Sequence, residues 1–428
     1  MGIVCRGSEN TQPVFSAPHP PPDTKHEQLS SATGWFWYMV PRDPGAPPKL
    51  TRRLTLVIHS LAQGGAERDM AHLARCWAER GDDVALVTLD AVDADSYPLA
   101  DAVTRIGLGM VGVSRGWMQA ISNNRRRIAA VRDVLQQRSP QTIVSFIDRM
   151  NVMTLKAAAG LGDPVIVSER IDPRHHEPGR IWRWLRQRTY PLCTAQVVLT
   201  HSVRDWCRRL APGKPVHVIP NPARRPEAGS AEQAPAWDVR GKRVLLGMGR
   251  LHPQKGFDLL LPLFARLIAS HPDWHLVLLG EGDQRAPLEQ QVAQLGLQQH
   301  VSLPGWVADV AGSLSRSELF VLPSRYEGFG NVVAEALACG VPVVTRDCPS
   351  GPGEIVRDEI DGLVVPAHDL EALEQALDRV MSDDALRSRF AARAPEVLDR
   401  FSEQKFLAQW DAVLDGNSEA EVDAILTR

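Results

Sequence analysis

The sequence predicts an α/β fold built from two doubly wound domains, each with a parallel sheet. From residue 54 onward, short and continuously apolar β-branched runs alternate with helical stretches. Runs of this kind are typical of parallel strands that helices cover on both faces. The 428 residues are also too many for one ordinary core and fit two domains. We therefore expect two Rossmann-like domains in tandem.

Each predicted strand is a run of four to six residues, or of three in one case. In the first domain the strands are expected at 54–58, 84–89, 103–106, 142–147, 165–167, 196–199 and 216–219, and in the second at 243–247, 275–279, 300–303, 318–322, 341–344 and 362–365. Ligands of doubly wound sheets bind at the carboxyl ends of the strands. With two such sheets, we expect the site in the cleft that they face.

The remaining segments complete the predicted organisation. The domains are expected at 51–225 and 239–400, joined by a polar, Pro/Ala-rich linker at 226–238. An amphipathic helix begins after Asp369, its expected cap, and a last helix spans 402–414 within the terminal segment 401–428. Residues 1–50 are rich in proline and are predicted to be a disordered extension. Within them, "GWFWYMV" (34–40) is read as dispensable, with a membrane or partner anchor as the alternative.

Charge is divided unevenly between the two halves. Residues 54–225 hold 24 Lys and Arg against 16 Asp and Glu, whereas residues 226–428 hold 18 against 31. The basic half is therefore expected to face an anionic surface or ligand. The six cysteines show no C-x-x-C spacing, which favours reduced cytosolic thiols over a disulfide frame or a zinc site. Nothing approaches the ~18 consecutive apolar residues of a membrane-spanning helix.

A glycine pair follows the first strand. In "HSLAQGGAERDM", Gly64 and Gly65 precede a helix whose first turn contains Glu67. Paired glycines let a ligand approach the backbone, and a helix N-terminus offers N–H groups to an anion. No Lys-Ser/Thr follows, so this is not a P-loop. A plain tight turn is the alternative.

The second domain opens with a similar but more basic loop. "VLLGMGRLHPQKGFDLLL" ends a strand and passes Gly249 before presenting Arg250 and Lys255 ahead of the next helix. Two cations on one strand-to-helix loop suit a diphosphate, whose charge they neutralise without a metal ion. Solvated surface charges are the alternative.

Two glutamates flank a glycine turn in "SRYEGFGNVVAEALACGVP" (324–342). Glu327 is expected in the loop after a buried strand, where it faces the cleft and a sugar. Asn331 is the expected cap of the next helix, and N–H groups near Gly330 point to the same place. Glu335, one turn further, would accept two ribose hydroxyls. The alternative is one carboxylate for the helix dipole and one on the surface.

"EGFGNVVAE" resembles the E-x7-E signature of retaining glycosyltransferases with two Rossmann-like domains facing a cleft, the GT-B fold, and specifically of family 4. Five further stretches are similar to that family's motifs and stand in its order: "GGAER" (64–68), "GRLHPQKG" (249–256), "GEGDQRAPLEQ" (280–290), "LPGWVADV" (303–310) and "FSEQKFLAQW" (401–410). The resemblance covers roughly residues 54–415. It implies an acceptor-binding first domain and a second domain that binds a nucleotide sugar.

The resemblance also implies roles for matching positions. Arg250 and Lys255 would bind the donor diphosphate and, with Glu327 on the sugar hydroxyls, form the catalytic set. Glu335 would hold the ribose and Val307 the base. The donor-binding set is Gly64, Gly65, Gly249, Arg250, Lys255, Val307, Glu327, Phe329, Gly330, Asn331 and Glu335. The helix 402–414 would cross back to the first domain, and no metal or cofactor is implied.

Two lookalike motifs suggest other classes. "DAD" (93–95) resembles the metal-binding D-x-D of a different glycosyltransferase fold, but it lies in a loop after the second strand. "GLGMVG" (107–112) matches the G-x-G-x-x-G of dinucleotide-binding oxidoreductases. It follows the third predicted strand, not the first, and is interpreted as an acceptor loop.

The segment "VSERIDPRHHEPGRIWRWLRQRTYPLC" (167–193) is expected on the acceptor side. Ser168, Glu169 and Arg170 end a strand and should face the cleft. Similar "SER-x-DPR" segments occur in family members that add N-acetylhexosamines to polyprenyl-diphosphate-linked glycans. His175-His176 is expected to contact solvent or acceptor and not to bind a metal. The acceptor-binding set is Glu67, Arg68, Glu169, Arg170 and His175.

Basic and aromatic residues recur in two first-domain stretches. One is 114–132, and the other is the helix that carries Arg180, Arg183, Arg186, Arg188, Trp182, Trp184 and Tyr190. Arg and Trp suit the headgroup region of an anionic bilayer. A solvated face and a nucleic-acid surface are the alternatives, and no nucleic-acid motif accompanies them.

The sequence as a whole favours a metal-independent, retaining hexosyltransferase. It would move a hexose or N-acetylhexosamine from a nucleotide diphosphate sugar, expected to be a UDP-sugar, to a lipid-linked glycan at the inner face of a bacterial membrane. A nucleotide-sugar epimerase and a non-catalytic nucleotide-sugar-binding protein are the rival interpretations.

Overall fold

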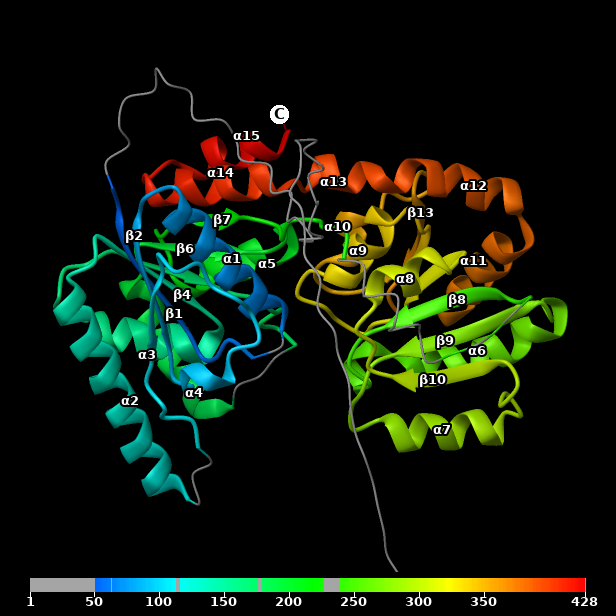
Figure 1. Ribbon diagram of the computed structural model, residues 1–428, viewed down its shortest axis with the longest axis horizontal. Coiled ribbons are helices and arrows are strands. Elements are labelled where there is room, and N and C mark those ends of the chain that lie inside the picture. Colours follow the sequence, from blue (N-terminus) through cyan, green and yellow to red (C-terminus); the bar gives the residue numbers. More distant parts are fainter. Residues whose placement is uncertain are drawn as a thin grey trace, which may run out of the picture. The chain divides into compact units, whose positions relative to one another are not determined.

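Two parallel sheets with helices around them make up the structure (Figure 1). The computed structural model describes residues 51–427 except 63, 113–115, 176–178, 227–236, 238 and 240. Within these, the first sheet has the order β3-β2-β1-β4-β5-β6-β7 and the second β10-β9-β8-β11-β12-β13. We call the parts that carry them the first and the second lobe. Both lobes belong to one compact unit, Thr51–Arg428.

Every strand predicted from the sequence is present. The strands are β1 (Arg53–Ile58), β2 (Asp83–Thr88), β3 (Thr104–Gly107), β4 (Thr142–Phe146), β5 (Val165–Ser168), β6 (Ala195–Val198), β7 (Val216–Val218), β8 (Arg243–Met248), β9 (Trp274–Leu279), β10 (Val301–Gly305), β11 (Leu319–Leu322), β12 (Val343–Asp347) and β13 (Gly362–Pro366). All named pairs of strands are parallel. The prediction of two doubly wound parallel sheets is confirmed.

Helices and short 3₁₀ turns connect these strands. The helices are α1 (Gly65–Glu79), α2 (Trp117–Arg138), α3 (Asp148–Ala158), α4 (Arg180–Thr189), α5 (His201–Leu210), α6 (Phe257–Ser270), α7 (Arg285–Gln294), α8 (Val310–Ser315), α9 (Asn331–Ala338), α10 (Pro352–Ile355), α11 (Leu370–Ser382), α12 (Asp384–Arg393), α13 (Val397–Arg400), α14 (Glu403–Leu414) and α15 (Glu419–Thr427); the 3₁₀ turns are η1 (Val92–Ala94), η2 (Tyr190–Leu192), η3 (Pro253–Lys255) and η4 (Ala394–Glu396). Asp369 caps α11 as predicted, because its carboxylate accepts the backbone N–H of Ala372 at 2.8 Å. None of the described helices combines the length and apolar character that crossing a bilayer requires.

Side chains that alternate along the strands form a hydrophobic core on each face of each sheet. In β1, Leu54 and Leu56 pack with α1 and α14, whereas Val57 packs on the other side with α2 and α3. In β8, Leu245 packs with α6 and Leu246 with α9. Successive side chains of a strand point to opposite faces. Apolar residues on both faces therefore hold every central strand between two helical layers.

The C-terminal helices pack on the first lobe, although the chain reaches them from the second. Trp410 of α14 is fully buried against the rings of Phe146 and Trp77, with centroids 5.6 and 6.3 Å away. Asp411 accepts hydrogen bonds from the Trp77 indole at 3.1 Å and from Arg52 at 2.8 Å. The predicted crossing of this helix back to the first lobe is confirmed.

Other expectations lie outside the described residues or stay untested. The extension 1–50 and most of the linker 226–238 belong to the part of the chain that is not described. The domain boundaries at 225, 239 and 400 remain predictions.

Candidate active site

Two loops of the second lobe meet at the carboxyl edge of its sheet, after the neighbouring strands β8 and β11. The loop after β8 carries Lys255, and the loop after β11 carries Ser324 and Glu327. Lys255 Nζ donates to Glu327 Oε1 at 2.7 Å, and the Ser324 hydroxyl donates to the same oxygen at 2.6 Å. Glu327 is only 5% exposed. The two residues that the sequence assigned to sugar and diphosphate thus form an ion pair, in which Glu327 is buried and Lys255 half-buried.

Two hydrogen bonds connect these loops to each other. The amide of Gln254 donates to the Tyr326 carbonyl at 3.0 Å, and the Arg325 N–H donates to the Gln254 carbonyl at 2.8 Å. Arg250, also on the loop after β8, is exposed. An exposed cation and a half-buried, paired cation on the same loop suit an anionic ligand.

Helix α9 starts beside this pair. Its N-cap is Gly330, with φ 97° in the left-handed region, and Asn331 is already the first helical residue. The prediction that Asn331 caps the helix is wrong, because its side-chain oxygen instead accepts from Asn221 of the first lobe at 2.9 Å. The first turn of a helix presents unpaired N–H groups, which favour an anion. Phe329 is buried just before this turn, with its ring edge against Phe401.

Glu335, one turn into α9, forms an ion pair across the two lobes. Its Oε1 accepts from Arg68 Nη1 at 2.9 Å, and its side chain is 12% exposed. Arg325 stands two residues before Glu327 but pairs with Asp258, and Glu335 has no basic residue within four positions in the chain. The fold supplies Lys255 to the first and Arg68 to the second.

A pocket of about 190 Å³ lies between the lobes at this place. Its lining comprises Gly65, Ala66, Arg170, Ile171, Leu199, Asn221, Gln254, Glu327, Gly328, Phe329, Gly330 and Asn331. Gly65 faces the other lobe so closely that an added Cβ would lie 2.8 Å from Asn331 Nδ2. The expected cleft between two sheets is confirmed, and Gly65 allows the lobes to approach each other there.

Arg170 lines the first-lobe side of this pocket, and Glu67 follows the lining residues Gly65 and Ala66 in α1. Arg170 is buried, pairs with Asp69 and donates to Asn221 at 2.6 Å, while its Nε and Nη1 have no hydrogen-bond partner. Burial raises the pKa of Glu67, and the positive charges of Arg170 and Arg250 oppose that rise. Arg170 therefore has N–H donors left for a ligand or water.

The expectation that Glu169 faces the cleft is wrong. Glu169 is 3% exposed, accepts from Arg186 at 3.1 Å and is hydrogen-bonded to the Tyr190 hydroxyl. Burial raises the pKa of Glu169, partly offset by the charge of Arg186. Ser168 is likewise buried, and Arg186 and Tyr190, expected on a basic surface, are interior residues. The strand end turns these side chains into the first lobe.

A larger pocket of about 690 Å³ lies at the carboxyl edge of the first sheet. It is lined by residues of α2, α3 and α4 and of the strand ends, including His59, Asn124, Arg127, Asp148, Arg149 and Trp182. Ile147, also in the lining, has φ 76°, an outlier for a β-branched residue. Such strain persists only where the surrounding structure enforces it, and often at functional sites.

The structure also locates the remaining candidates. His175 is exposed and its ring stacks on Tyr326 of the second lobe, with centroids 5.3 Å apart, whereas His176 lies outside the described residues. Val307 is half-buried beside the exposed Trp306, after β10. Asp95 of the "DAD" stretch is held by Arg105 at 2.7 Å in two hydrogen bonds. Gly107 ends β3, the strand at the edge of the first sheet.

Sequence reasoning missed Asn221, Ser324, Asp69 and Asp148. Asn221 and Asp148 each follow closely after a predicted strand, at the carboxyl edge where ligands gather. That position alone was a usable signal. Asp69 lies inside α1 and carries no such signal.

Comparison with known proteins agrees with this geometry. Residues 63–224 match the model "Glycosyltransferase Family 4", and residues 232–397 match "Glycosyl transferases group 1". The chain belongs to the family 4 glycosyltransferases with the GT-B fold.

Among curated relatives, an N-acetylgalactosaminyltransferase of Campylobacter jejuni, which acts on a diNAcBac-PP-undecaprenol-linked glycan, is 26% identical over 84% of this chain and 97% of its own. The lipopolysaccharide core biosynthesis glycosyltransferase LpsD of Rhizobium meliloti is 29% identical over 84% of this chain and 96% of its own. An exopolysaccharide phosphotransferase of Streptomyces coelicolor is 35% identical over 52% of this chain, but the match spans only 23% of that protein.

Solved structures show the same fold at low identity. Sucrose-phosphate synthase from Thermosynechococcus elongatus has a TM-score of 0.73 and 20% identity, with 85% of this chain and 99% of that one covered. Anabaena HepE in complex with UDP has a TM-score of 0.66 and 18% identity, with 85% and 100% covered.

Proposed function

We propose that the protein is a metal-independent, retaining transferase of a hexose or N-acetylhexosamine. The donor is a nucleotide diphosphate sugar, with UDP-sugars as the first candidates, and the acceptor is a polyprenyl-diphosphate-linked glycan. The observation that carries the proposal is the Lys255–Glu327 ion pair beside the first turn of α9, whose glutamate lines a pocket that both lobes form.

The donor fits these groups in a defined order. The diphosphate lies between Arg250, Lys255 and the N–H groups that open α9, where two cations and a helix N-terminus stabilise the departing charge. Glu327, held by Lys255 and Ser324, accepts hydrogen bonds from sugar hydroxyls. Glu335 binds the ribose once the Arg68 contact opens. The protein's own cations perform the charge stabilisation that a metal ion performs in other transferases.

The large first-lobe pocket is the proposed acceptor site. Its walls are apolar at Leu89, Met150 and Met153, and polar groups such as Asn124 and Arg127 border them. A mixed wall of this kind suits a sugar ring, which has apolar faces and hydroxyl edges. The relative from Campylobacter jejuni acts on a lipid-linked glycan, which supports this acceptor class.

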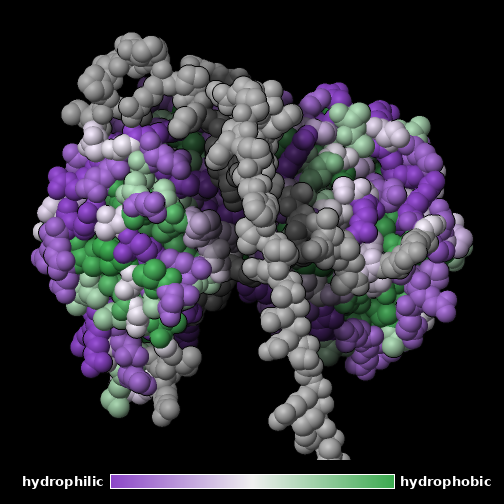
Figure 2. Space-filling model, in the orientation of Figure 1, coloured by the Kyte–Doolittle hydropathy of each residue, from purple (hydrophilic) through white to green (hydrophobic). Residues whose placement is uncertain are grey.

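The helices around that pocket support an approach to the membrane. Trp117, Met118 and Ile121 are exposed on the first turns of α2, and Ile181 and Trp184 are exposed on α4. Arg125, Arg126 and Arg180 stand exposed on the same helices. Hydrophobic residues (green) lie among hydrophilic ones over the side of the molecule where α2 runs (Figure 2). Such a surface favours peripheral binding to the anionic inner face of a bacterial membrane.

The test is an activity screen with the purified full chain. UDP- and GDP-sugars are each incubated with a polyprenyl-diphosphate-linked glycan, with and without a metal chelator, and the anomeric configuration of the product is determined by NMR. We expect nucleotide release only with acceptor present, an unchanged rate with chelator and a retained configuration. Epimerisation of a nucleotide sugar without acceptor would support the rival epimerase. A chain that ignores every nucleotide sugar would refute the proposal.

A further inference from the structure

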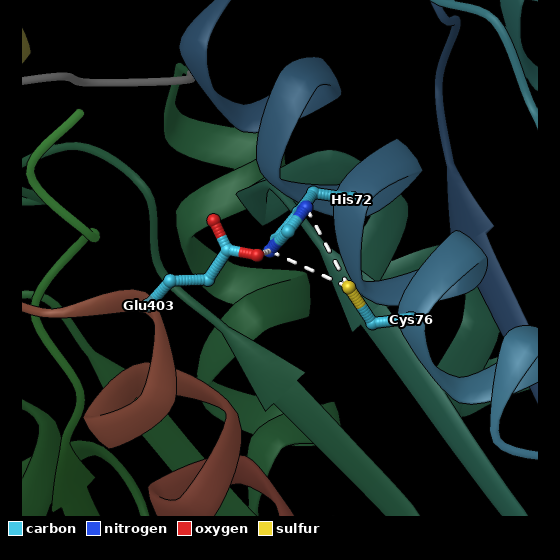
Figure 3. A group of neighbouring side chains, drawn as sticks. All are labelled: His72, Cys76 and Glu403. Carbon is cyan, nitrogen blue, oxygen red and sulfur yellow. Dashed lines mark hydrogen bonds and ion pairs between the residues drawn. The ribbon is translucent and has the colours of Figure 1, made fainter. Parts of the chain in front are cut away.

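Three side chains with metal-ligating atoms meet where α14 begins to pack on α1. His72 and Cys76 stand one turn apart on one face of α1, and Glu403 is the first residue of α14. In Figure 3 the imidazole points toward the Glu403 carboxylate, with the Cys76 sulfur beside it. None of the three lines either pocket described above. The cluster therefore lies outside the proposed donor and acceptor sites.

Two distances in this cluster are close to those of a tetrahedral zinc site. His72 Nε2 lies 3.2 Å from Glu403 Oε1 and 3.6 Å from Cys76 Sγ, and all three ligand atoms lie within 4.8 Å of one another. A zinc ion sits about 2.0 Å from nitrogen or oxygen and about 2.3 Å from sulfur, so tetrahedral angles require separations of about 3.3 and about 3.6 Å. The carboxylate oxygen is thus already spaced for an ion. Cys76 Sγ lies 3.7 Å from Nδ1 as well, so a rotation of the thiol or the ring accompanies ion binding.

The chemistry of the donors also suits zinc, which accepts imidazole, thiolate and carboxylate together. The cluster is half enclosed: His72 is buried, Cys76 is half-buried, and the Glu403 side chain is 42% exposed. An ion can therefore enter from the Glu403 side, and a water molecule can complete the coordination.

Binding of a metal ion requires proton changes in this cluster. Burial lowers the pKa of His72, so the ring is neutral, and Arg75 donates to its Nδ1 at 3.1 Å. Burial raises the pKa of the Cys76 thiol to about 11. When zinc binds Nε2, the ring proton moves to Nδ1, Arg75 turns away, and the thiol proton is released to water. The ligand charges then balance the ion, because a thiolate and a carboxylate face Zn²⁺.

We propose that His72, Cys76 and Glu403 bind one zinc ion, with water as the fourth ligand. The ion ties the first turn of α14 to α1 and so stabilises the return of the chain to the first lobe. The cysteine spacing in the sequence indicated no zinc site, because the third ligand is remote in the chain and only the fold brings it close.

The experiment measures zinc binding to the full chain. The protein is stripped with a chelator, dialysed against zinc sulfate and analysed for bound metal, and its affinity is found by competition with a chromophoric chelator. We expect one bound zinc ion, and cobalt in its place should give a thiolate charge-transfer absorption band. Cys76→Ala should weaken binding by at least about 100-fold and Glu403→Gln by about 10-fold. The matched control is Cys339→Ser, which alters a half-buried cysteine of the second lobe and should bind as the native chain does.

Thermal unfolding provides a readout that does not depend on transferase activity. Zinc should raise the melting temperature of the native chain and of Cys339→Ser, but not that of Cys76→Ala or Glu403→Gln. Arg75→Ala should keep or strengthen binding, because it removes a competing donor and a positive charge. If the native chain binds no zinc at micromolar concentration, or if Cys76→Ala and Glu403→Gln bind it equally well, the proposal is wrong and the cluster is an ion pair only. Should Cys76→Ala fail to fold, Glu403→Gln and the cobalt spectrum decide.

Discussion

Both sheets have a pair of oppositely charged residues near the carboxyl edge, but the two pairs differ in their surroundings. At the second-lobe edge, Lys255 pairs with Glu327, which lines the pocket between the lobes, and Arg250 of the same loop as Lys255 is exposed. At the first-lobe edge, Glu169 and Arg186 pair inside the lobe, behind a larger and more apolar pocket. A charged pair thus contributes a side chain to the pocket between the lobes in one case and lies inside the first lobe in the other. Charge alone in a sequence does not separate these two uses.

The first way to test this contrast removes the second-lobe cation. Lys255→Ala should lower kcat by about 100- to 1000-fold, because a preorganised charge that faces the departing diphosphate is lost. The assay is product formation at saturating donor. The control is Lys242→Ala, a lysine before β8 at the opposite end of the strand, which should retain activity. If Lys255→Ala retains its activity, the proposed mechanism is wrong.

The second test disrupts the first-lobe pair. Glu169→Ala should lower the free energy of unfolding by about 3 kcal/mol, because Arg186 is left buried with weaker compensation from Asp148 at 3.3 Å. Urea unfolding measures the change. Glu281→Gln, which breaks an exposed pair with Arg285, should change stability little. A Glu169→Ala chain that is as stable as the native one but has lost acceptor binding would show instead that Glu169 contacts the ligand.

The third test concerns the pair that joins the lobes. Glu335→Ala should weaken donor binding by about 10- to 100-fold, since two hydrogen bonds to ribose hydroxyls are lost. Arg68→Ala should have a smaller effect, because the arginine only occupies the carboxylate before the donor arrives. Titration calorimetry with UDP distinguishes the two variants. Equal losses would mean that Arg68 itself holds the nucleotide.

The fourth test compares exposed aromatic residues of the two lobes. Replacing Trp117 and Trp184 together by alanine should weaken binding to anionic vesicles several-fold, since both suit the headgroup region. Trp306→Ala is the matched control, because Trp306 is 62% exposed on the second lobe. Co-sedimentation with vesicles gives the comparison. An equal loss in the control variant would argue against a membrane-facing first lobe.

The smallest effect is expected from pH, measured with a chelator present. Burial would raise the pKa of Glu403, but the hydrogen bond from His72 and nearby arginines lower it to about 2. A depressed carboxyl pKa stabilises the fold above the unfolded value of about 4.5, and this contribution is lost as the pH falls towards 2. The stability difference between the native chain and Glu403→Gln should therefore shrink below pH 4.5 in urea unfolding. A difference that does not vary with pH would contradict this assignment.

The sequence by itself determined the strands, the doubly wound sheets and the glycine and charged loops that follow β1, β8 and β11. These features are local: apolar runs define strands that are buried on both faces, and the end of a parallel strand marks the ligand edge. Only the tertiary structure decided which charges meet. Glu327 acquires Lys255, Glu335 acquires Arg68, Glu169 turns inward to Arg186, and Glu403 reaches His72 and Cys76. Such pairings depend on the distances between segments that are remote in the chain. The periodicity of a strand or helix is local and does not predict these distances.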